Sequence, residues 1–223
     1  MIRKFSGFSR KQRFLEIGCG NGIVLNSLRK STNYELLGSD IYIQGLKNAK
    51  IRLKGVELIQ ADASKFIDAN NYDAIGVFDV LEHIEEDKKV LHNLFQSLRP
   101  GGYLYITVPQ YMYLWSQFDD IAFHKRRYEM MELLEKVKEA GFKVEYLGSF
   151  IFFLFPIMLV SRSLTKFKKS KEIKGTEEFI SGKMINGILQ FFIYLDEVLI
   201  RMGLRLPFGG SLICVAKKEE NII

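Results

Sequence analysis

Cysteine is scarce in this chain of 223 residues, in which only Cys19 and Cys214 occur. Two thiols supply neither a disulfide framework nor a cysteine-based metal cluster. Such scarcity suits a reducing compartment, because disulfide-rich scaffolds belong to oxidising ones. The N-terminus is basic but no apolar run follows it, so no secretory signal peptide is recognisable. We therefore predict a cytoplasmic protein.

Apolar runs long enough to cross a bilayer are also missing. The longest, Phe150–Val160, has 11 residues and contains Pro156, whereas a spanning helix needs about 20. A second apolar segment, Ile185–Ile200, carries Asp196 and Glu197, which are unfavourable at a bilayer centre. Two alternatives remain for residues 150–206. They form a helical cap over a binding cleft, or they lay an apolar face on a membrane surface.

The bulk composition is that of a single globular domain spanning residues 1–223. Apolar residues make up 48% of the chain and charged residues 26%, which are ordinary globular values. The net charge of +6 permits attraction to anionic lipid or nucleic acid but requires neither. Basic residues crowd the segments Arg3–Arg13 and Arg162–Lys174. Each cluster is either a solvated face or, for the second one, a surface that meets anionic headgroups.

The most informative segment is Leu15–Gly22, which reads Leu-Glu-Ile-Gly-Cys-Gly-Asn-Gly. An apolar strand ends there in an acid, three glycines follow at every second position, and a helical pattern begins at Ile23. Glycines are needed where a backbone turns sharply and a ligand lies against it. The free N–H groups of the following helix point at the same loop. The pattern indicates a ligand-binding turn, with a plain strand-to-helix turn as the alternative.

The glycine spacing excludes two common nucleotide sites. No Gly-x-x-x-x-Gly-Lys-Ser/Thr phosphate loop is present. The third glycine, Gly22, comes one residue too early for the Gly-x-Gly-x-x-Gly dinucleotide fingerprint. Glu16 would repel phosphate and attract an ammonium or sulfonium group. The segment therefore predicts a ligand with a ribose and a cationic amino acid part but no pyrophosphate.

Predicted strands and helices alternate along the chain, which is typical of a parallel sheet covered on both faces. The helix that begins at Asp87, whose side chain can cap it, ends before the turn-forming Arg99-Pro100-Gly101-Gly102. We predict strands at 13–17, 35–39, 56–60, 72–78, 103–108, 142–146 and 211–216, and helices at 23–29, 43–53, 128–140 and 185–200.

These features resemble the class I S-adenosylmethionine-dependent methyltransferases, and the likeness runs from Phe14 to Arg127 with a matching last strand. The resemblance implies an α/β, Rossmann-like, seven-stranded and mostly parallel sheet with helices on both faces. It also implies a last strand that enters antiparallel beside the sixth. The hydrophobic helical insertion at 150–206, between the sixth and seventh strands, departs from the minimal pattern. About a dozen residues precede the first strand, where relatives carry a helix over the cofactor; an open site, a partner in trans or a shortened chain would each account for this.

The resemblance assigns the cofactor S-adenosylmethionine to the carboxyl ends of the strands. Asp40 ends the second strand, where its two oxygens can accept both ribose hydroxyls; capping the next helix is the alternative. The resemblance implies that Ile41 packs against adenine, that Asp62 accepts from the adenine amino group and that the amide of Ala63 meets a ring nitrogen. Asp62 has a competing use in capping a short turn. The predicted cofactor-binding set is Glu16, Gly18, Cys19, Gly20, Gly22, Asp40, Ile41, Asp62, Ala63, Asp79 and Val80.

The segment Phe78–Ile84 resembles the family motif beside the reacting methyl group. Backbone near Asp79 would face the cofactor, and Glu82 and His83 would open towards the methyl acceptor. An imidazole can take the proton of an acceptor hydroxyl, since its ordinary pKa lies near neutrality. His83 is accordingly the first candidate catalytic base, with orientation of substrate or local structure as alternatives. His92 is predicted to lie on the surface of its helix.

A second acceptor-side element follows the fifth strand. His124, Arg126 and Arg127 form part of a His-x-Arg-Arg-Tyr element resembling one in methyltransferases of cell-surface glycan or lipid pathways. Guanidinium groups bind phosphate or carboxylate bidentately, so both arginines are candidate substrate ligands and His124 a weaker catalytic candidate. The alternative is a loop that packs on the next helix. Trp115 either lines the acceptor pocket or covers the core. We expect no metal site, because no ligand constellation is apparent in the sequence.

Three hypotheses follow for the whole chain. The first is an enzyme that methylates a small or lipid-linked acceptor, with oxygen as the expected atom. The second is a cofactor-binding module that docks on a membrane or a larger partner and has little activity of its own. The third, a nucleic-acid methyltransferase, is weaker, because Asn-Pro-Pro-Tyr-like signatures and an appended RNA-binding domain are absent from the sequence. The oligomeric state is not predicted.

Overall fold

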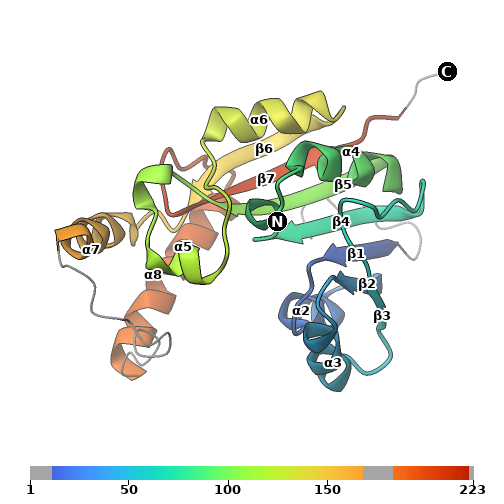
Figure 1. Cartoon of the computed structure of the whole chain (residues 1–223), viewed down its shortest axis with the longest axis horizontal. Coiled ribbons are helices and arrows are strands. Elements are labelled where there is room, and N and C mark those ends of the chain that lie inside the picture. The colour runs from blue at the N-terminus through green and yellow to red at the C-terminus, as the bar shows by residue number, and fades with distance from the viewer. Residues whose placement is uncertain (1–11, 168–182, 221–223) are drawn as a thin grey trace.

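The computed structural model describes residues 12–167 and 183–220 (Figure 1). Its seven strands form a single sheet in the order β3-β2-β1-β4-β5-β7-β6. The strands are β1 (Arg13–Ile17), β2 (Glu35–Asp40), β3 (Glu57–Gln60), β4 (Tyr72–Phe78), β5 (Leu98–Pro109), β6 (Lys143–Phe150) and β7 (Ser211–Lys217). Strands β1 to β5 pair in parallel, and β7 runs antiparallel between β5 and β6. The predicted sheet and its antiparallel last strand are confirmed.

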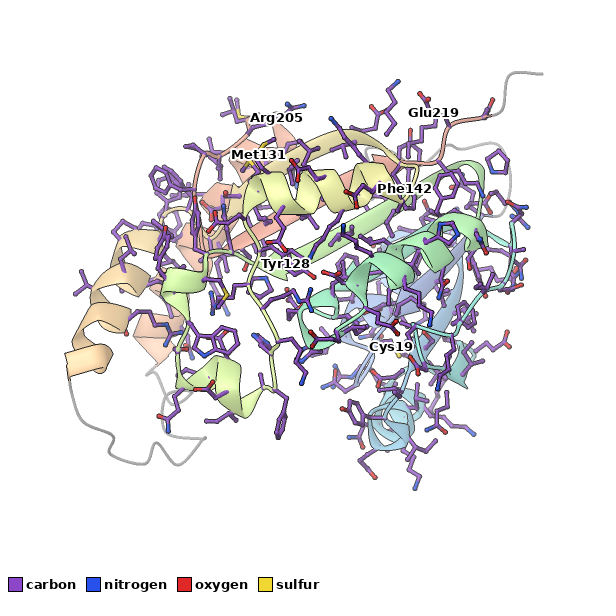
Figure 2. The ribbon with its side chains drawn as sticks, turned by 45° about the horizontal axis from the view of Figure 1, so that its top comes forward. Cys19, Tyr128, Met131, Phe142, Arg205 and Glu219 are labelled. Atoms are coloured by element: carbon purple, nitrogen blue, oxygen red, sulfur yellow. The ribbon has the colours of Figure 1, made fainter. Side chains whose placement is uncertain are left out.

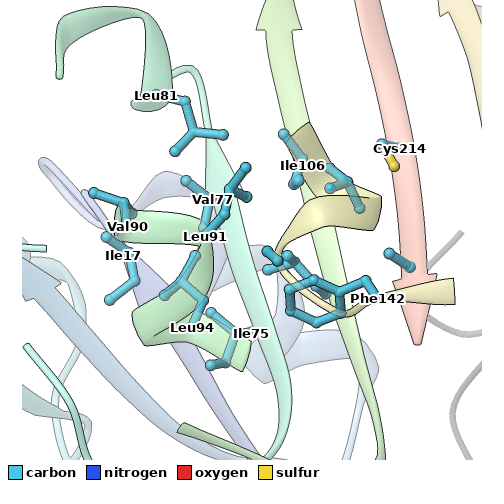
Figure 3. Close-up of a cluster of buried hydrophobic side chains, with 14 of the residues drawn as sticks. Ile17, Ile75, Val77, Leu81, Val90, Leu91, Leu94, Ile106, Phe142 and Cys214 are labelled. Carbon is cyan, nitrogen blue, oxygen red and sulfur yellow. The ribbon is translucent and has the colours of Figure 1, made fainter. Parts of the chain in front are cut away.

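Helices cover both faces of the sheet, as predicted. The helices are α2 (Ile23–Ser31), α3 (Ile43–Arg52), α4 (Asp87–Ser97), α5 (Gln117–Ile121), α6 (Met130–Glu139), α7 (Phe155–Phe167) and α8 (Lys183–Arg201), with 3-10 turns η1 (Leu81–His83) and η2 (Met112–Leu114). Buried residues of α4 and α6 pack on one face, where Leu91, Leu94 and Phe142 meet the strands (Figure 3). Leu25 and Leu46, from α2 and α3, belong to the core on the other face.

The strand order reverses between β1 and β4, which are neighbours although two strands separate them in sequence. Ligands of open α/β sheets bind in the crevice beyond the carboxyl ends at such a point. The loops after β1 and β4 are the glycine loop and the segment that contains η1. The topology therefore brings the two strongest sequence motifs to one edge.

Several predicted boundaries differ from the structure, and three of these differences have a clear structural cause. Helix α4 ends at Ser97 as expected, but β5 begins at Leu98, because Leu98 pairs with Tyr72 before a register shift. Helix α6 begins at Met130 and not at residue 128, because Tyr128 is buried and bridges to Gln110. Strand β6 continues to residue 150, four residues beyond the predicted end, because β7 pairs with it along that length.

Helices α7 and α8 lie between β6 and β7 and extend beyond the end of the sheet in Figure 1. The C-terminal part of α8 packs against the sheet, where Ile200 belongs to the same hydrophobic core as Leu25 and Leu46. Just after the helix, the carbonyl of Leu204 accepts a hydrogen bond from the hydroxyl of Tyr146. Ahead of it, Ile188 and Phe191 are exposed. No helix within the described ranges is both long and apolar enough to cross a membrane. The charged residue that the sequence singled out in this segment, Asp196, is buried.

We predict that Asp196 holds helix α8 against the connection between β6 and α7. Its Oδ2 accepts a 2.7 Å hydrogen bond from the backbone amide of Phe152 in the β6–α7 connection. Asp196→Ala leaves that amide without its acceptor, so urea unfolding should show a loss of about 1–3 kcal/mol. Glu197→Ala is the matched control, since Glu197 forms an exposed pair with Arg201 and such pairs contribute about 0.3–0.5 kcal/mol. Equal losses in the two variants would contradict the assignment.

Candidate functional site

The glycine loop folds back on the end of β2. Gly18, Gly20 and Gly22 all have positive φ angles of 50–76°, which non-glycine residues adopt at a cost. The amide of Gly20 donates to Oδ2 of Asp40 at 2.8 Å. A Cβ at Gly18 would collide with the side chain of Val80, whereas a Cβ at Gly20 would meet no described atom within 4 Å. The loop thus packs tightly against the segment after β4 at Gly18, whereas the space next to Gly20 is unoccupied by described atoms.

Glu16 is a buried acid beneath this loop. One of its carboxylate oxygens receives a hydrogen bond from the backbone of Leu25, while Oε2 is buried without a hydrogen-bond partner among the described residues. Burial, and secondarily the charge of Asp40, raises the pKa of Glu16 to about 8. A buried carboxylate in this condition is stabilised by an arriving cation.

Asp40 keeps acceptor capacity although backbone groups already bind it. Oδ2 accepts from Gly20 and Oδ1 accepts from the amide of Tyr42 at 2.8 Å. The second bond closes a local turn before α3, but Asp40 does not cap that helix, whose N-cap residue is Tyr42. Each carboxylate oxygen has a further lone pair, which leaves room for two ribose hydroxyls. Ile41, the predicted adenine contact, is exposed beside it.

Asp62 is used locally in the structure. Its Oδ1 accepts from both the amide and the hydroxyl of Ser64, and Oδ2 lies 3.5 Å from Nζ of Lys65. The hydrogen bonds from Ser64 lower the pKa of Asp62. Ala63 is buried, and its carbonyl accepts from Asn93. The turn-capping alternative is therefore present, and an adenine contact would fall to the remaining acceptor positions.

Asp79 opens the segment after β4 in an unusual conformation. Its φ angle is +53°, a value that only a few per cent of non-glycine residues adopt. Two bonds to Thr107 of β5 hold it there: the Asp79 amide donates to the Thr107 carbonyl at 3.0 Å, and Oδ1 accepts from the Thr107 hydroxyl at 3.1 Å. The next residue, Val80, packs its side chain against Gly18. The predicted cofactor contacts of the two motifs thus lie on facing loops.

Glu82, the next acid, is fully buried. Neither of its carboxylate oxygens has a hydrogen-bond partner in the described part of the chain. Burial is the largest cause that raises its pKa to about 8, and the charge of Asp79 adds to it. The sequence predicted a substrate-side position for Glu82 but gave no signal of its burial.

His83 and His124 meet across the same space. Their ring centroids are 4.7 Å apart and their planes are nearly perpendicular, at 82°. Protein atoms displace water from part of the His83 ring, which together with His124 lowers the pKa of His83. Nδ1 of His124 lies 2.9 Å from Oδ1 of Asp119. The two histidines that were considered separately in the sequence therefore belong to one cluster with Glu82.

This cluster was not expected. The sequence predicted no metal constellation, yet the ligand atoms of Glu82, His83 and His124 all lie within 4.8 Å of one another. The sequence signal is weak because 40 residues separate His83 from His124, and only the topology joins them.

In the structure Arg127, one of the two arginines predicted to bind substrate, pairs with an acid of its own loop. Arg127 is buried and binds Asp119 through two contacts, Nε to Oδ1 at 2.7 Å and Nη2 to Oδ2 at 3.1 Å. Its Nη1 donates to the carbonyl of Gln110. Burial disfavours the charge on Asp119, but the hydrogen bonds from Arg127 and Ser116 outweigh it and lower the pKa. Arg127 is thus engaged by the protein, which is the packing alternative for this loop.

Arg126 is also engaged. It donates to the carbonyl of Glu85 and lies 3.2 Å from Oδ2 of Asp87. The same oxygen of Asp87 accepts from Tyr128 at 2.7 Å and from Lys136 at 2.6 Å, and Figure 2 shows Tyr128 between the sheet and α6. The predicted capping role of Asp87 is wrong, because its carboxylate turns inward to these three donors and makes no side-chain cap. Sequence spacing gave no sign of this network.

The remaining candidates have plain environments. Trp115 is half-buried, and its indole N–H donates to Oδ1 of Asp120. Cys19 lies in the glycine loop (Figure 2), where burial raises the pKa of its thiol to about 12. Both cysteines are free and buried. His92 is exposed on α4 beside Gln96, as predicted.

Comparisons with known proteins agree with this geometry. A family model described as a methyltransferase domain matches residues 2–147. The chain is 27% identical over 114 residues to the ubiquinone biosynthesis O-methyltransferase of Salmonella newport, a match that covers 48% of this chain and 46% of that protein. The chain thus spans less than half the length of the curated relatives it matches.

Solved structures share the fold at low identity. A phosphoethanolamine N-methyltransferase of Haemonchus contortus, in complex with S-adenosyl-L-methionine, superposes with a TM-score of 0.64 at 18% identity over 98% of this chain and 51% of that one. A SAM-dependent methyltransferase from Archaeoglobus fulgidus gives a TM-score of 0.63 at 20% identity over 97% and 89% of the two chains.

The pKa of Glu16 gives a prediction on stability. In the folded chain Glu16 keeps its proton to about pH 8, whereas in the unfolded chain it ionises near the ordinary value of 4.5. Between these values the unfolded state binds fewer protons, so the wild-type free energy of unfolding falls with rising pH by up to about 1.4 kcal/mol per unit from this group. Glu16→Gln lacks this loss. Its stability advantage over wild type should grow from pH 4.5 to 8 and then level off.

Urea unfolding of both proteins across that range measures the difference. Glu57→Gln is the control, because Glu57 is exposed on β3 and its charge stays hydrated in both states. An advantage of Glu16→Gln that is independent of pH would show that Glu16 ionises normally in the fold.

Proposed function

The chain belongs to the class I S-adenosylmethionine-dependent methyltransferases, and we propose that it transfers the methyl group to an oxygen of a small or lipid-linked acceptor. The observation that carries the proposal is the buried Glu16 beside Asp40, beneath a glycine loop that is open above Gly20. A cationic ligand with a ribose fits these two acids, and S-adenosylmethionine is the cofactor of the family.

Each part of the cofactor has a proposed partner. Glu16 attracts the charged methionine part, whose ammonium and sulfonium groups supply the cation that the carboxylate lacks. Asp40 accepts the ribose hydroxyls, and Ile41 offers an exposed apolar surface to adenine. Asp62 and the amide of Ala63 remain the proposed contacts at the adenine edge. Gly18 and Val80, which touch each other, would flank the cofactor between the two loops.

Methyl transfer then needs an acceptor oxygen in line with the sulfonium. An oxygen lone pair forms the O–C bond as the S–C bond breaks, the electron pair of the broken bond stays on sulfur, and S-adenosylhomocysteine leaves as a neutral thioether. The hydroxyl proton passes to a base or to water. Because the sulfonium already activates the methyl group, catalysis is mostly positioning. Glu82, His83 and His124 lie on the far side of Asp79 and Val80, where the acceptor is proposed to enter.

Contacts of helix α7 favour a cap over the acceptor side of the cleft. Phe155 of α7 packs against Tyr111 with ring centroids 5.8 Å apart, and the guanidinium of Arg162 lies 5.5 Å from the ring of Phe118. Tyr111 and Phe118 flank the loop that carries Trp115. Helix α7 therefore contacts the acceptor-side segment, which favours the cap alternative. The name of the Salmonella newport relative is consistent with oxygen as the methylated atom.

A second function, a docked cofactor-binding module with little activity, keeps one supporting observation. Ile188, Phe191 and Tyr194 of α8 are exposed together with Ile157 and Val160 of α7, which provides an apolar surface for a membrane at the cytoplasmic face. The Lys-rich stretch proposed to meet headgroups falls largely on residues 168–182, which lie outside the described residues, as do residues 1–11 of the basic start. A nucleic-acid substrate receives no support from these contacts.

Calorimetry tests the cofactor. We expect S-adenosylmethionine to bind and NAD not to bind. Asp40→Ala should weaken binding by roughly 1.5–3 kcal/mol for each ribose hydrogen bond lost, because the acceptor is charged. His92→Ala, on the exposed face of α4, is the control and should bind as wild type. Tight binding of NAD without binding of S-adenosylmethionine would end the proposal. Normal cofactor binding without turnover on any hydroxyl acceptor would favour the docked module.

Vesicle flotation tests the apolar surface. The membrane alternative requires the chain to bind anionic vesicles at low salt, with binding that weakens as salt screens the charges. The double variant Ile188→Ser, Phe191→Ser should bind less, because it removes exposed apolar area from α8. Ile51→Ser removes an equally exposed isoleucine from α3 and should have no effect. Absence of vesicle binding under these conditions would leave only the cap.

A further inference from the structure

The cluster of Glu82, His83 and His124 contains a buried carboxyl group to which no described residue donates a hydrogen bond. Glu82 is fully buried, and both of its oxygens lack a hydrogen-bond partner among residues 12–167 and 183–220. Buried carboxylates are normally paired with a cation or coordinated to a metal. The nearest guanidinium, that of Arg127, is already committed to Asp119 and to the carbonyl of Gln110. The charge of Arg127 therefore acts on Glu82 only from a distance, and no described cationic group binds the Glu82 oxygens directly.

The neighbouring acid Asp79 makes a cation beside Glu82 still more favourable. Its carboxylate interacts electrostatically with Glu82 and with both imidazoles. Two acids and two imidazoles thus face one space, and the acids repel each other without a cation between them. When ionised, Asp79 and Glu82 therefore concentrate negative charge in the loop after β4.

The orientation of His124 is that of a metal ligand. Its Nδ1 lies 2.9 Å from Oδ1 of Asp119, and Asp119 stays ionised because Arg127 and Ser116 donate to it. Nδ1 is therefore the donor in this bond, which leaves the lone pair on Nε2. Histidines that bind metals commonly donate their other ring nitrogen to a carboxylate in this way.

His83 is held by the same loop. The carbonyls of Ala122 and Phe123 form hydrogen bonds with its ring. Phe123 has a φ angle of +58°, a strained value for an aromatic residue. The backbone of the loop between α5 and α6 thus orients His83, while Asp119 orients His124.

We propose that Glu82, His83 and His124 bind one divalent transition-metal cation, such as Mn²⁺ or Zn²⁺, on the acceptor side of the cleft. Two imidazole nitrogens and one carboxylate suit these ions better than Mg²⁺, which prefers oxygen ligands. Their ligand atoms lie within 4.8 Å of one another. Two atoms that each lie about 2.1 Å from one ion are at most about 4.2 Å apart, so small side-chain rotations close the site.

Three protein ligands leave coordination positions open. The further consequence rests on the proposed function: the cation would hold an acceptor hydroxyl through its oxygen and favour loss of the hydroxyl proton to water. His83 then serves as a ligand and not as the proton acceptor. This narrows the acceptor class to molecules that present a hydroxyl group to a metal ion.

The histidines give a direct test on the unaltered chain. The chain has three histidines, of which His92 lies on the exposed face of α4, outside the cluster. After chelator treatment, titration with Mn²⁺ should broaden the ring NMR signals of His83 and His124 and spare that of His92. Equal broadening of all three signals, or no broadening at millimolar Mn²⁺, would overturn the proposal.

Calorimetry with Zn²⁺ and Mn²⁺ gives the stoichiometry, and one ion per chain is expected. Glu82→Gln, which keeps the shape but removes the charge, should weaken binding at least tenfold, and Asp119→Asn should weaken it by about 10–100-fold through the orientation of His124. His92→Gln should bind as wild type. Circular dichroism checks the fold of each variant. Unchanged affinity in folded Glu82→Gln would refute the site.

Affinity for S-adenosylmethionine, measured on the same metal-free protein, separates the two proposals. The two acids proposed to hold the cofactor, Glu16 and Asp40, lie outside the cluster at the ends of β1 and β2, so the cofactor should bind with or without the ion. Failure to bind the cofactor would count against the proposed function and leave the metal result to be judged by the histidine signals.

Discussion

Two buried carboxylates without cationic partners determine the character of this cleft. Glu16 ends the first strand and Glu82 follows the fourth, and burial raises the pKa of both to about 8. The protein keeps these acids away from water although the unfavourable desolvation reduces its stability. Hydrophobic packing on both faces of the sheet compensates for this. A fold that retains two such groups at one edge is preorganised for positive charge, which we propose comes from the cationic cofactor at Glu16 and from a metal ion at Glu82.

The sequence predicted the sheet because its signals were local. Alternating strands and helices, turn residues and the spacing of Gly18, Gly20 and Gly22 are each readable within a dozen residues. The antiparallel last strand came from the resemblance to a family and is confirmed by its pairing with β5 and β6. The cofactor residues were assigned by position at strand ends, and the structure brings Glu16, Asp40 and Val80 to one edge. Their roles remain predictions.

The acceptor side was less predictable because its interactions join distant segments. Arg127 looked like a substrate ligand in sequence, since a basic residue in a loop carries no sign of its partner. Asp119 and the carbonyl of Gln110 occupy it in the fold. The predicted cap at Asp87 failed for the same reason, because Lys136 of α6 and Tyr128 of the loop before α6 both donate to its carboxylate. Likewise, His83 and His124 form one cluster only after β5 and α5 have returned the chain to the cleft.

The hydrogen bonds around Asp119 make the segment between β5 and α6 a structural unit of its own. Ser116, His124 and Arg127 all contact this one carboxylate, and they lie within 12 consecutive residues. Backbone bonds from Tyr111 and Tyr128 close the base of the segment. The hydrogen bonds that hold this segment in shape are therefore formed mostly by its own residues. Transplanted as one piece onto another sheet of this type, it would bring His124 already oriented, whereas transfer of the histidine alone would not.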